Sequence, residues 1–480
     1  MTSSDIQSLR SKYESAGQGH VFQFWDKLSP SEQESLLTQL DQINPQFVTE
    51  VAQNTLNGKH NTGVATPDII SPLPKEATGS VVDADPSQIA AWSKLGLEAI
   101  AANKVGVVLL SGGQGTRLGS SNPKGCYDVN LPSHKSLFQL QAERIIKITE
   151  LAKAAVPTAS ESVVVPWYIM TSGPTRKSVE QFFKDNKYFG LDPANVIFFE
   201  QGVLPCLTPE GKIILESKSS VAVAPDGNGG IYNALYKHNI LADIKKRGIE
   251  HIHTYCVDNC LVKVADPAFI GFALQRNVDI ATKVVRKRDA TESVGLIVSK
   301  NGAPGVIEYS EIPSELASAT EAHDDKLLKF RAANIVNHYY SAKFLLNIPN
   351  WESSFLPFHV AHKKIPFADA ETGSTVKPSA PNGVKLEQFV FDVFPRLAFN
   401  NFASLEVNRQ DEFSPLKNGP GAKVDCPETS RSDVLGQSAR WLTAAGAILE
   451  GDVEVSPLTS YGGEGLESFK GRKIPASSIV

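Results

Sequence analysis

Two cations, Arg117 and Lys124, lie in a glycine-rich stretch with the sequence LLSGGQGTRLGSSNPKG, residues 109–125. Glycines let backbone amides approach a ligand without a Cβ in the way, and cations beside such amides are typical of a phosphate-binding loop. The preceding apolar run, Val105–Leu110, has the length and β-branched content of a buried strand. The stretch therefore predicts a strand followed by an anion-binding loop that holds Gly112, Gly113, Gly115 and Gly119.

The spacing of this loop excludes two common phosphate-binding motifs. The dinucleotide fingerprint G-x-G-x-x-G would need glycine where Leu118 stands, and no G-K-[ST] closes the loop as in a P-loop. An ordinary glycine-rich turn would leave two cations at this offset unexplained. We therefore interpret the stretch as a nucleotide-binding loop of another type.

Further polar residues follow predicted strands, and ligands collect at the carboxyl ends of strands in a parallel sheet. A carboxylate in such a place is a natural Mg²⁺ ligand, because Mg²⁺ favours hard oxygens and shares them with phosphates. An aspartate that only turns the chain is the open alternative. The residues concerned are Gln201 after a strand at 196–199, Asp258 after a strand at 253–257, and Glu308 with Tyr309 beyond a hairpin turned by Asn301-Gly302.

The segment APDGNGG, residues 224–230, leads into a helix predicted from Ile231. A helix start preceded by Asp226, Gly227 and Asn228 offers free backbone amides to an anionic ligand. An N-cap turn without a ligand is equally compatible with the pattern.

Bulk composition narrows the class of protein. A chain of 480 residues exceeds one hydrophobic core, so two or three domains are expected, and 41% apolar with 21% charged residues is typical of globular proteins. The net charge of −5 argues against a nucleic-acid partner. Without a signal-peptide core or a membrane-length apolar run, we expect a cytoplasmic protein that does not bind membranes. Five scattered cysteines predict reduced thiols.

The order of strand and helix patterns predicts the fold. Residues 1–100 are expected to form a helical domain, with a capping box at Ser29, Pro30 and Glu32, a connector at 60–84 and a helix from Asp85. Alternating strands and helices over 101–405 predict an α/β catalytic domain, a Rossmann-like, mostly parallel sheet with helices on both faces. Residues 406–480 are expected to form a small β-rich domain. The segments expected between 101 and 405 include 136–155, 163–170, 176–183, 196–199, 231–246, 253–257, 267–275 and 278–285.

Two other groups of residues are expected to have structural rather than functional roles. The basic run Lys283, Arg286, Lys287 and Arg288 is interpreted as a solvated face, and His251 with His253 as structural histidines.

Ten separated motifs occur in one order along the chain, namely SGGQGTRLG, NPKG, FEQG, APDGNGG, VDN, VGLIV, VIEYSE, ANIVNHYY, KLEQFVFD and EFSPLKN. Together they resemble the eukaryotic UDP-N-acetylglucosamine pyrophosphorylases over roughly two thirds of the chain, from about residue 97 to 418. The resemblance implies that UTP and N-acetylglucosamine 1-phosphate give UDP-N-acetylglucosamine and pyrophosphate with Mg²⁺, which supplies the precursor for chitin, N-glycans and GPI anchors. It also implies a monomer or a weak homodimer.

The same resemblance implies roles for individual residues. Arg117, Lys124 and Lys417 would be the catalytic cations, and Asp258 would hold the metal. One departure is Ser111, where the family usually has alanine. The uridine would be held by Leu110, Ser111, Gly112, Gly113, Gln201 and Gly227. The residues that would line the sugar pocket are Asn228, Gly295, Glu308, Tyr309, Asn334, Phe389 and Phe391. The residues that would face phosphates or metal are Asp258, Lys385 and Lys417.

Two alternatives stay open. The first is another uridylyltransferase, one that uses glucose 1-phosphate, whose signature loop usually lacks the arginine found here at Arg117. A non-catalytic nucleotide-sugar sensor on the same fold would have no need of Arg117, Lys124 and Asp258 to stabilise a leaving pyrophosphate.

Overall fold

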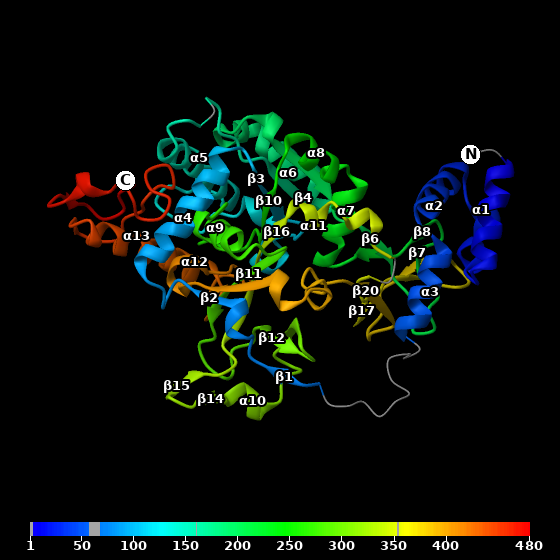
Figure 1. Ribbon diagram of the computed structural model, residues 1–480. Coiled ribbons are helices and arrows are strands. Elements are labelled where there is room, and N and C mark those ends of the chain that lie inside the picture. Colours follow the sequence, from blue (N-terminus) through cyan, green and yellow to red (C-terminus); the bar gives the residue numbers. More distant parts are fainter. Residues whose placement is uncertain (1–2, 57–67, 160, 353–354) are drawn as a thin grey trace. The chain divides into compact units, whose positions relative to one another are not determined.

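The computed structural model describes residues 3–56, 68–159, 161–352 and 355–480 (Figure 1). The chain divides into two compact units, each made of three segments. The boundaries of these units differ from those of the three predicted domains. The smaller unit is Met1–Pro67, Gln201–Ile231 and Glu352–Asp392, and the larger is Asp68–Glu200, Tyr232–Trp351 and Val393–Val480. Part of the predicted connector at 60–84 lies outside the described residues.

The larger unit is built around one 11-stranded sheet. Its strands are β1 (Ile70–Ser71), β2 (Thr78–Ser80), β3 (Val105–Leu110), β4 (Trp167–Thr171), β5 (Val196–Glu200), β10 (His251–Cys256), β11 (Ile280–Arg286), β12 (Leu296–Lys300), β13 (Ala303–Ile307), β16 (Ala332–Ser341) and β21 (Phe402–Glu406). The main path is β2-β21-β11-β16-β10-β3-β4-β5, in which only β16 runs against its neighbours. The predicted mostly parallel sheet is confirmed, and β3, β10 and β11 end on the same edge.

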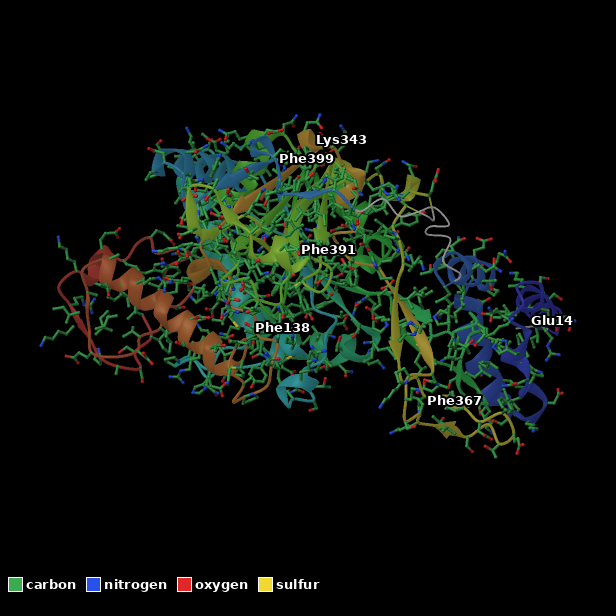
Figure 2. All side chains as sticks on the ribbon, turned by 90° about the horizontal axis from the view of Figure 1, so that it is seen from below. Glu14, Phe138, Lys343, Phe367, Phe391 and Phe399 are labelled. Atoms are coloured by element: carbon green, nitrogen blue, oxygen red, sulfur yellow. The ribbon has the colours of Figure 1, made fainter. Side chains whose placement is uncertain are left out.

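Helices cover both faces of this sheet. The helices are α4 (Pro86–Ala101), α5 (Leu137–Ala155), α6 (Gly173–Asp185), α7 (Ile231–Lys237), α8 (Ile240–Arg247), α9 (Pro267–Arg276), α10 (Ser314–Ser318), α11 (Ala342–Leu345), α12 (Arg409–Glu412) and α13 (Pro427–Ala444). One face packs against α4, α5, α6 and α9 through a cluster that includes Val107 and Phe138. Phe138 is labelled among the side chains in Figure 2. On the other face, the Tyr168 hydroxyl donates to Asp243 of α8 at 2.8 Å.

Several local predictions are confirmed because nearby residues decide them. β3 has the predicted bounds, and α5 begins after Ser136, whose side chain caps the helix. The Asn301-Gly302 turn joins β12 to β13 with both residues at positive φ, the geometry that a two-residue hairpin of this type needs.

Three predictions of structure are wrong. The helix expected over 231–246 is broken between α7 and α8, where Asn239 has φ 59. The last segment of the chain is not β-rich, because it contains the 18-residue helix α13 and its strands β22 (Ile448–Leu449) and β23 (Lys473–Ile474) have two residues each. Lys287 is 5% exposed and does not belong to a solvated face, and neither does Lys283, which is 0% exposed beneath Phe269 of α9. Its ammonium has buried carboxylate partners that lie far away in sequence.

The smaller unit combines helices with short strands. Its helices are α1 (Ser3–Ser15), α2 (Pro30–Gln42) and α3 (Pro45–Leu56), and its strands are β6 (Val203–Pro205), β7 (Leu215–Ser217), β8 (Ser220–Val221), β9 (Val223–Pro225), β17 (His359–Lys363), β18 (Phe367–Ala368), β19 (Thr375–Val376) and β20 (Gly383–Glu387). The predicted capping box of α2 is present, with Glu32 accepting from the Ser29 amide at 2.9 Å. Leu36 and Val48 share a core with Leu207 and Val384.

Two further observations concern membrane-spanning segments and the state of the cysteines. None of the described helices is long and apolar enough to cross a bilayer. All five cysteines are free thiols, as predicted.

Candidate functional site

The glycine-rich loop leaves β3 and folds back on itself. The Gly115 amide donates to the Asn122 carbonyl at 3.1 Å, and the Lys124 amide donates to the Gly113 carbonyl at 3.4 Å. Leu118 anchors the loop in a buried cluster, whereas Arg117 beside it is exposed. The loop therefore presents exposed backbone and a cation on a buried support, which suits an anionic ligand.

Gly125 at the end of the loop fits only because it has no side chain. A Cβ there would lie 2.2 Å from Cζ of Phe138, which is itself wholly buried and 5.0 Å, centroid to centroid, from the Phe183 ring. We expect Gly125→Ala to lower the free energy of unfolding by about 1–3 kcal/mol, because the ring has no room to move. Denaturant unfolding measures this. Gly113→Ala is the control, since a Cβ at Gly113 meets no atom within 4 Å; equal unfolding midpoints for the two variants would contradict the expectation.

The structure brings three of the predicted catalytic and metal-binding residues together. Lys124 Nζ lies 3.8 Å from Asp258 Oδ2, with side chains 19% and 20% exposed. Lys417 is exposed and follows Leu416, whose amide donates to the Asp258 carbonyl at 2.9 Å. Burial and the negative charge of Asp258 raise the pKa of the Cys256 thiol, whereas the positive charges of Lys124 and Lys417 oppose this rise.

The turn that carries Asp258 is held from two sides. From α5, Arg144 donates to the Cys260 carbonyl at 2.8 Å and Gln141 to the Val257 carbonyl at 3.3 Å. From the segment after α12, the Ser414 amide donates to Asn259 Oδ1 at 3.0 Å. Asp258 is therefore a partly exposed carboxylate on a fixed turn at the carboxyl end of β10.

Three predicted sugar-site residues also come together in the larger unit. The Asn334 amide donates to the Gly295 carbonyl at 2.8 Å, and a Cβ on Gly295 would lie 3.1 Å from Glu308 Oε1. Asn334 is 8% exposed, and its Oδ1 accepts from the Val336 amide at 3.0 Å. Tyr309, next to Glu308, is 53% exposed.

A second group forms within the smaller unit. Gln201 donates to the Gly227 carbonyl at 2.6 Å, and the Asn228 side-chain carbonyl accepts from the Val390 amide at 3.0 Å. Gly227 has φ 85, and a Cβ there would lie 2.2 Å from the Gln388 carbonyl oxygen, so only glycine fits. The Phe389 and Phe391 rings stack with centroids 5.2 Å apart. Lys385 lies on β20, apart from these contacts.

These contacts limit which side-chain atoms of Asn228 can bind a ligand. Because its Oδ1 is already bonded to the backbone of the segment before Phe391, its Nδ2 is the group best placed for a ligand. The sequence pattern missed Gln388, whose carbonyl closes on Gly227 and accepts from the Gly229 amide at 2.8 Å. Its place between Glu387 and Phe389 in KLEQFVFD was the available signal.

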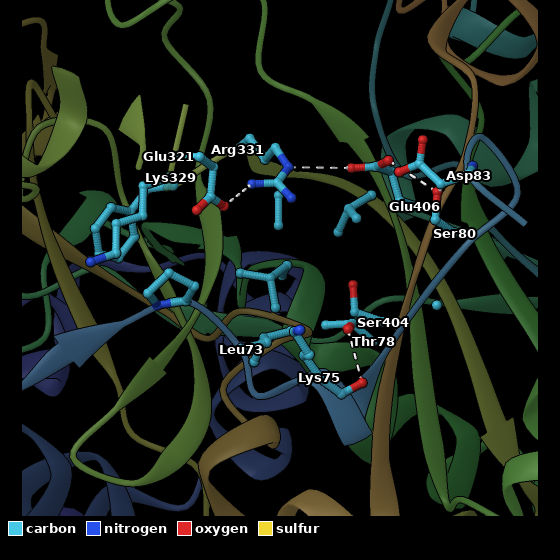
Figure 3. Close-up of a pocket in the computed structure, with 16 residues that line it drawn as sticks. Leu73, Lys75, Thr78, Ser80, Asp83, Glu321, Lys329, Arg331, Ser404 and Glu406 are labelled. Carbon is cyan, nitrogen blue, oxygen red and sulfur yellow. Dashed lines mark hydrogen bonds and ion pairs between the residues drawn. The ribbon is translucent and has the colours of Figure 1, made fainter. Parts of the chain in front are cut away.

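A separate cavity of about 490 Å³ opens elsewhere in the larger unit (Figure 3). None of the predicted site residues lines it. Its Arg331 lies between two carboxylates, 2.6 Å from Glu321 and 3.8 Å from Glu406, and Ser80 donates to Glu406 at 3.1 Å (Figure 3). The positive charge of Arg331 is therefore already neutralised by carboxylates of the protein, unlike that of the exposed Arg117 in the glycine-rich loop.

Comparison with known proteins decides the family. The profile of the family described as "UTP--glucose-1-phosphate uridylyltransferase" matches residues 45–422. That range includes every predicted site residue. The chain belongs to this uridylyltransferase family. Relatives from Saccharomyces cerevisiae and Arabidopsis thaliana carry the names UDP-N-acetylglucosamine pyrophosphorylase and UDP-N-acetylglucosamine diphosphorylase 2, which confirms the resemblance seen in the motifs.

Relatives of this uridylyltransferase-family chain match it over nearly its whole length. A UDP-N-acetylglucosamine pyrophosphorylase of Saccharomyces cerevisiae is 49% identical and covers 97% of both chains. The human UDP-N-acetylhexosamine pyrophosphorylase-like protein 1 is 44% identical over 99% of this chain and 97% of its own. The crystal structure of the uridine diphosphate N-acetylglucosamine pyrophosphorylase of Trypanosoma brucei, in complex with inhibitor, has a TM-score of 0.84 at 30% identity and covers 98% and 95% of the chains. Leishmania major UDP-glucose pyrophosphorylase, 16% identical with a TM-score of 0.55 over 81% and 77%, shares the fold.

Proposed function

We propose that this protein joins UTP and N-acetyl-α-D-glucosamine 1-phosphate to give UDP-N-acetylglucosamine and pyrophosphate. The observation that carries the proposal is the grouping of Lys124, Asp258 and Lys417 beside a glycine-rich loop with exposed Arg117. The names of relatives at 49% and 42% identity over nearly the full length support the N-acetyl sugar. The family description names glucose 1-phosphate, so that sugar is the second candidate.

The residues suit phosphoryl chemistry without a covalent enzyme intermediate. The second pKa of a phosphate monoester is about 6, so the sugar phosphate is largely a dianion at neutral pH and needs no general base. It would attack the α-phosphate of UTP in line, breaking the bond to the β-phosphate. Arg117, Lys124 and Lys417 would stabilise the charge on the departing pyrophosphate.

Mg²⁺ is part of the proposal. Mg²⁺ keeps several waters and is usually held by one or two carboxylates together with substrate phosphates. Asp258, a partly exposed carboxylate on a fixed turn, fits that donor set, and the described residues contain no cluster of three or more His, Cys, Asp or Glu side chains that would form a complete protein cage. When bound, the ion would neutralise phosphate charge, and Asp258 would hold it at the turn.

The direct test of this function is product formation. Purified protein with UTP, N-acetylglucosamine 1-phosphate and Mg²⁺ should release pyrophosphate and form UDP-N-acetylglucosamine, the second identified by chromatography and mass. Omission of either substrate should abolish both signals. A protein that binds UDP-N-acetylglucosamine but forms no product would instead be the nucleotide-sugar sensor.

Asp258→Asn tests the metal ligand. The amide keeps the shape but loses the charge, so we expect the Mg²⁺ concentration for half-maximal rate to rise and kcat to fall at any Mg²⁺ concentration. Rates are measured across a Mg²⁺ titration for both proteins. An unchanged rate and Mg²⁺ dependence would leave Asp258 as a residue that turns the chain.

A further inference from the structure

Lys283 carries a buried charge that the proposed reaction does not use. It lies on β11 with its Nζ 5.3 Å from the centre of the Phe269 ring of α9, and its side chain is 0% exposed. Its Nζ is 2.5 Å from Asp266 Oδ2 and also contacts the Glu412 carboxylate, and these two acids are 6% and 5% exposed. Burial opposes ionisation of Asp266, but the positive charges of Lys283 and Lys263 outweigh it and lower its pKa.

Stability alone does not explain such a cluster. The free-energy cost of removing charged groups from water often exceeds the attraction between them. Proteins in which such an ion pair is replaced by well-packed apolar side chains of similar size are frequently as stable. What a buried, hydrogen-bonded ion pair does provide is a single geometry for the segments that it joins. The question is therefore which segments Lys283 fixes.

Glu412 leads directly to the proposed phosphate site. Its own carbonyl accepts from Asn259 Nδ2 at 2.7 Å, and two residues later the Ser414 carbonyl accepts from the Cys260 amide at 2.9 Å. The next contact along the segment is the bond from the Leu416 amide to the Asp258 carbonyl, at 2.9 Å. Lys417 follows. The side chain of Glu412 is thus tied to β11, and its backbone is tied to the turn of Asp258.

We propose that Lys283 is a positioning residue that fixes segment 412–417 through Glu412 and thereby aligns Asp258 with Lys417. The inference rests on the proposed function for the roles of Asp258 and Lys417. A displacement of reacting groups by about 1 Å can cost around a hundredfold in rate, so the effect on turnover can exceed the effect on folding.

The test uses a charge-balanced double variant of the full chain and a single variant. Lys283→Met with Glu412→Gln removes both charges together and leaves Asp266 in the field of Lys263. Glu412→Gln alone is the milder variant, because Lys283 keeps Asp266 as its partner. The matched control is Arg286→Met with Glu406→Gln, which removes a 2.7 Å ion pair between β11, the strand of Lys283, and β21, without a bond to residues 258–260.

Positioning has signatures that a purely structural role lacks. In the double variant at Lys283 and Glu412, we expect kcat to fall about 10- to 100-fold and the Mg²⁺ requirement to rise, while KM for the sugar phosphate changes less than about twofold. Amide exchange at Cys260 and Leu416 should become at least about tenfold faster, since both amides depend on the segment. The Glu412→Gln variant should shift all of these readouts in the same direction by less. The control should change none of them.

The exchange measurement needs no catalysis, so it separates this inference from the proposed function. If the wild-type protein forms no nucleotide sugar but the two amides still exchange faster in the double variant, the proposed function fails and the positioning of the turn stands. If kcat, Mg²⁺ dependence and exchange at Cys260 and Leu416 all match the control, the inference is overturned, even when the melting temperature falls.

Discussion

Lys124→Ala is expected to lower kcat about a hundredfold and to leave the fold intact. Removing one preorganised charge-stabilising group from a reacting centre typically costs about 3 kcal/mol of transition-state stabilisation. Stability should change by less than about 1 kcal/mol, because Lys124 and Asp258 are each partly exposed at a separation of 3.8 Å. Initial rates of pyrophosphate release at saturating substrates and a thermal melt measure the two quantities.

The control for this variant is a highly exposed lysine in the same unit. Lys94 on α4 has a side chain that is 78% exposed, and Lys94→Ala should keep full activity. Arg117→Ala should behave like Lys124→Ala, because the loop presents Arg117 to solvent beside its exposed glycines. Near wild-type turnover in either of these variants would remove the loop from the catalytic site.

The second large effect concerns the sugar. We expect kcat/KM for N-acetylglucosamine 1-phosphate to exceed that for glucose 1-phosphate by about 30- to 1000-fold. An N-acetyl group can pair with an amide and bury its methyl against an aromatic wall, and losing both contacts costs roughly 2–4 kcal/mol. Within the smaller unit, Asn228 Oδ1 accepts from the amide of Val390, between the stacked Phe389 and Phe391, and we expect Asn228 Nδ2 to pair with the N-acetyl group.

Both sugar phosphates are compared at saturating UTP, together with N-acetylgalactosamine 1-phosphate, which should be accepted less well because it differs at the 4-hydroxyl. Asn228→Ala should narrow the preference between the first two sugars, whereas a change at exposed Tyr236 should leave it as it is. Equal or better use of glucose 1-phosphate would support the activity named in the family description instead.

The parts of this fold that neighbouring residues decide were predictable. The Ser29 capping box, the apolar strand Val105–Leu110 and the Asn301-Gly302 turn depend on residues within a few positions, and all three form. The order of strands and helices then fixes a parallel sheet, because short crossovers between strands leave few other arrangements. The grouping of Lys124 with Asp258 follows from strands that end on the same edge.

What the sequence hid depends on partners far away along the chain. Lys283 is surrounded by charged neighbours and resembles a surface residue, but its partners Asp266 and Glu412 lie 17 and 129 positions away. The break at Asn239 was also missed, because a single left-handed residue leaves the apolar pattern around it almost unchanged. The helix α13 has a weakly apolar sequence, and its neighbouring glycines favoured the wrong interpretation of that segment.

The interleaving of the two units also constrains how the protein can be made. The chain passes from one unit to the other after residues 67, 200, 231, 351 and 392. The apolar sides of α2 and α3 find Leu207, Val384 and Leu386 as core partners, and the last of these emerges some 330 residues after α3. At about 5–20 residues per second, ribosomes would leave these helices without their full core for roughly 20 to 60 seconds. Newly made N-terminal helices are thus natural clients for chaperones, and a message truncated before the codon of Asp392 would release a chain in which neither unit is complete.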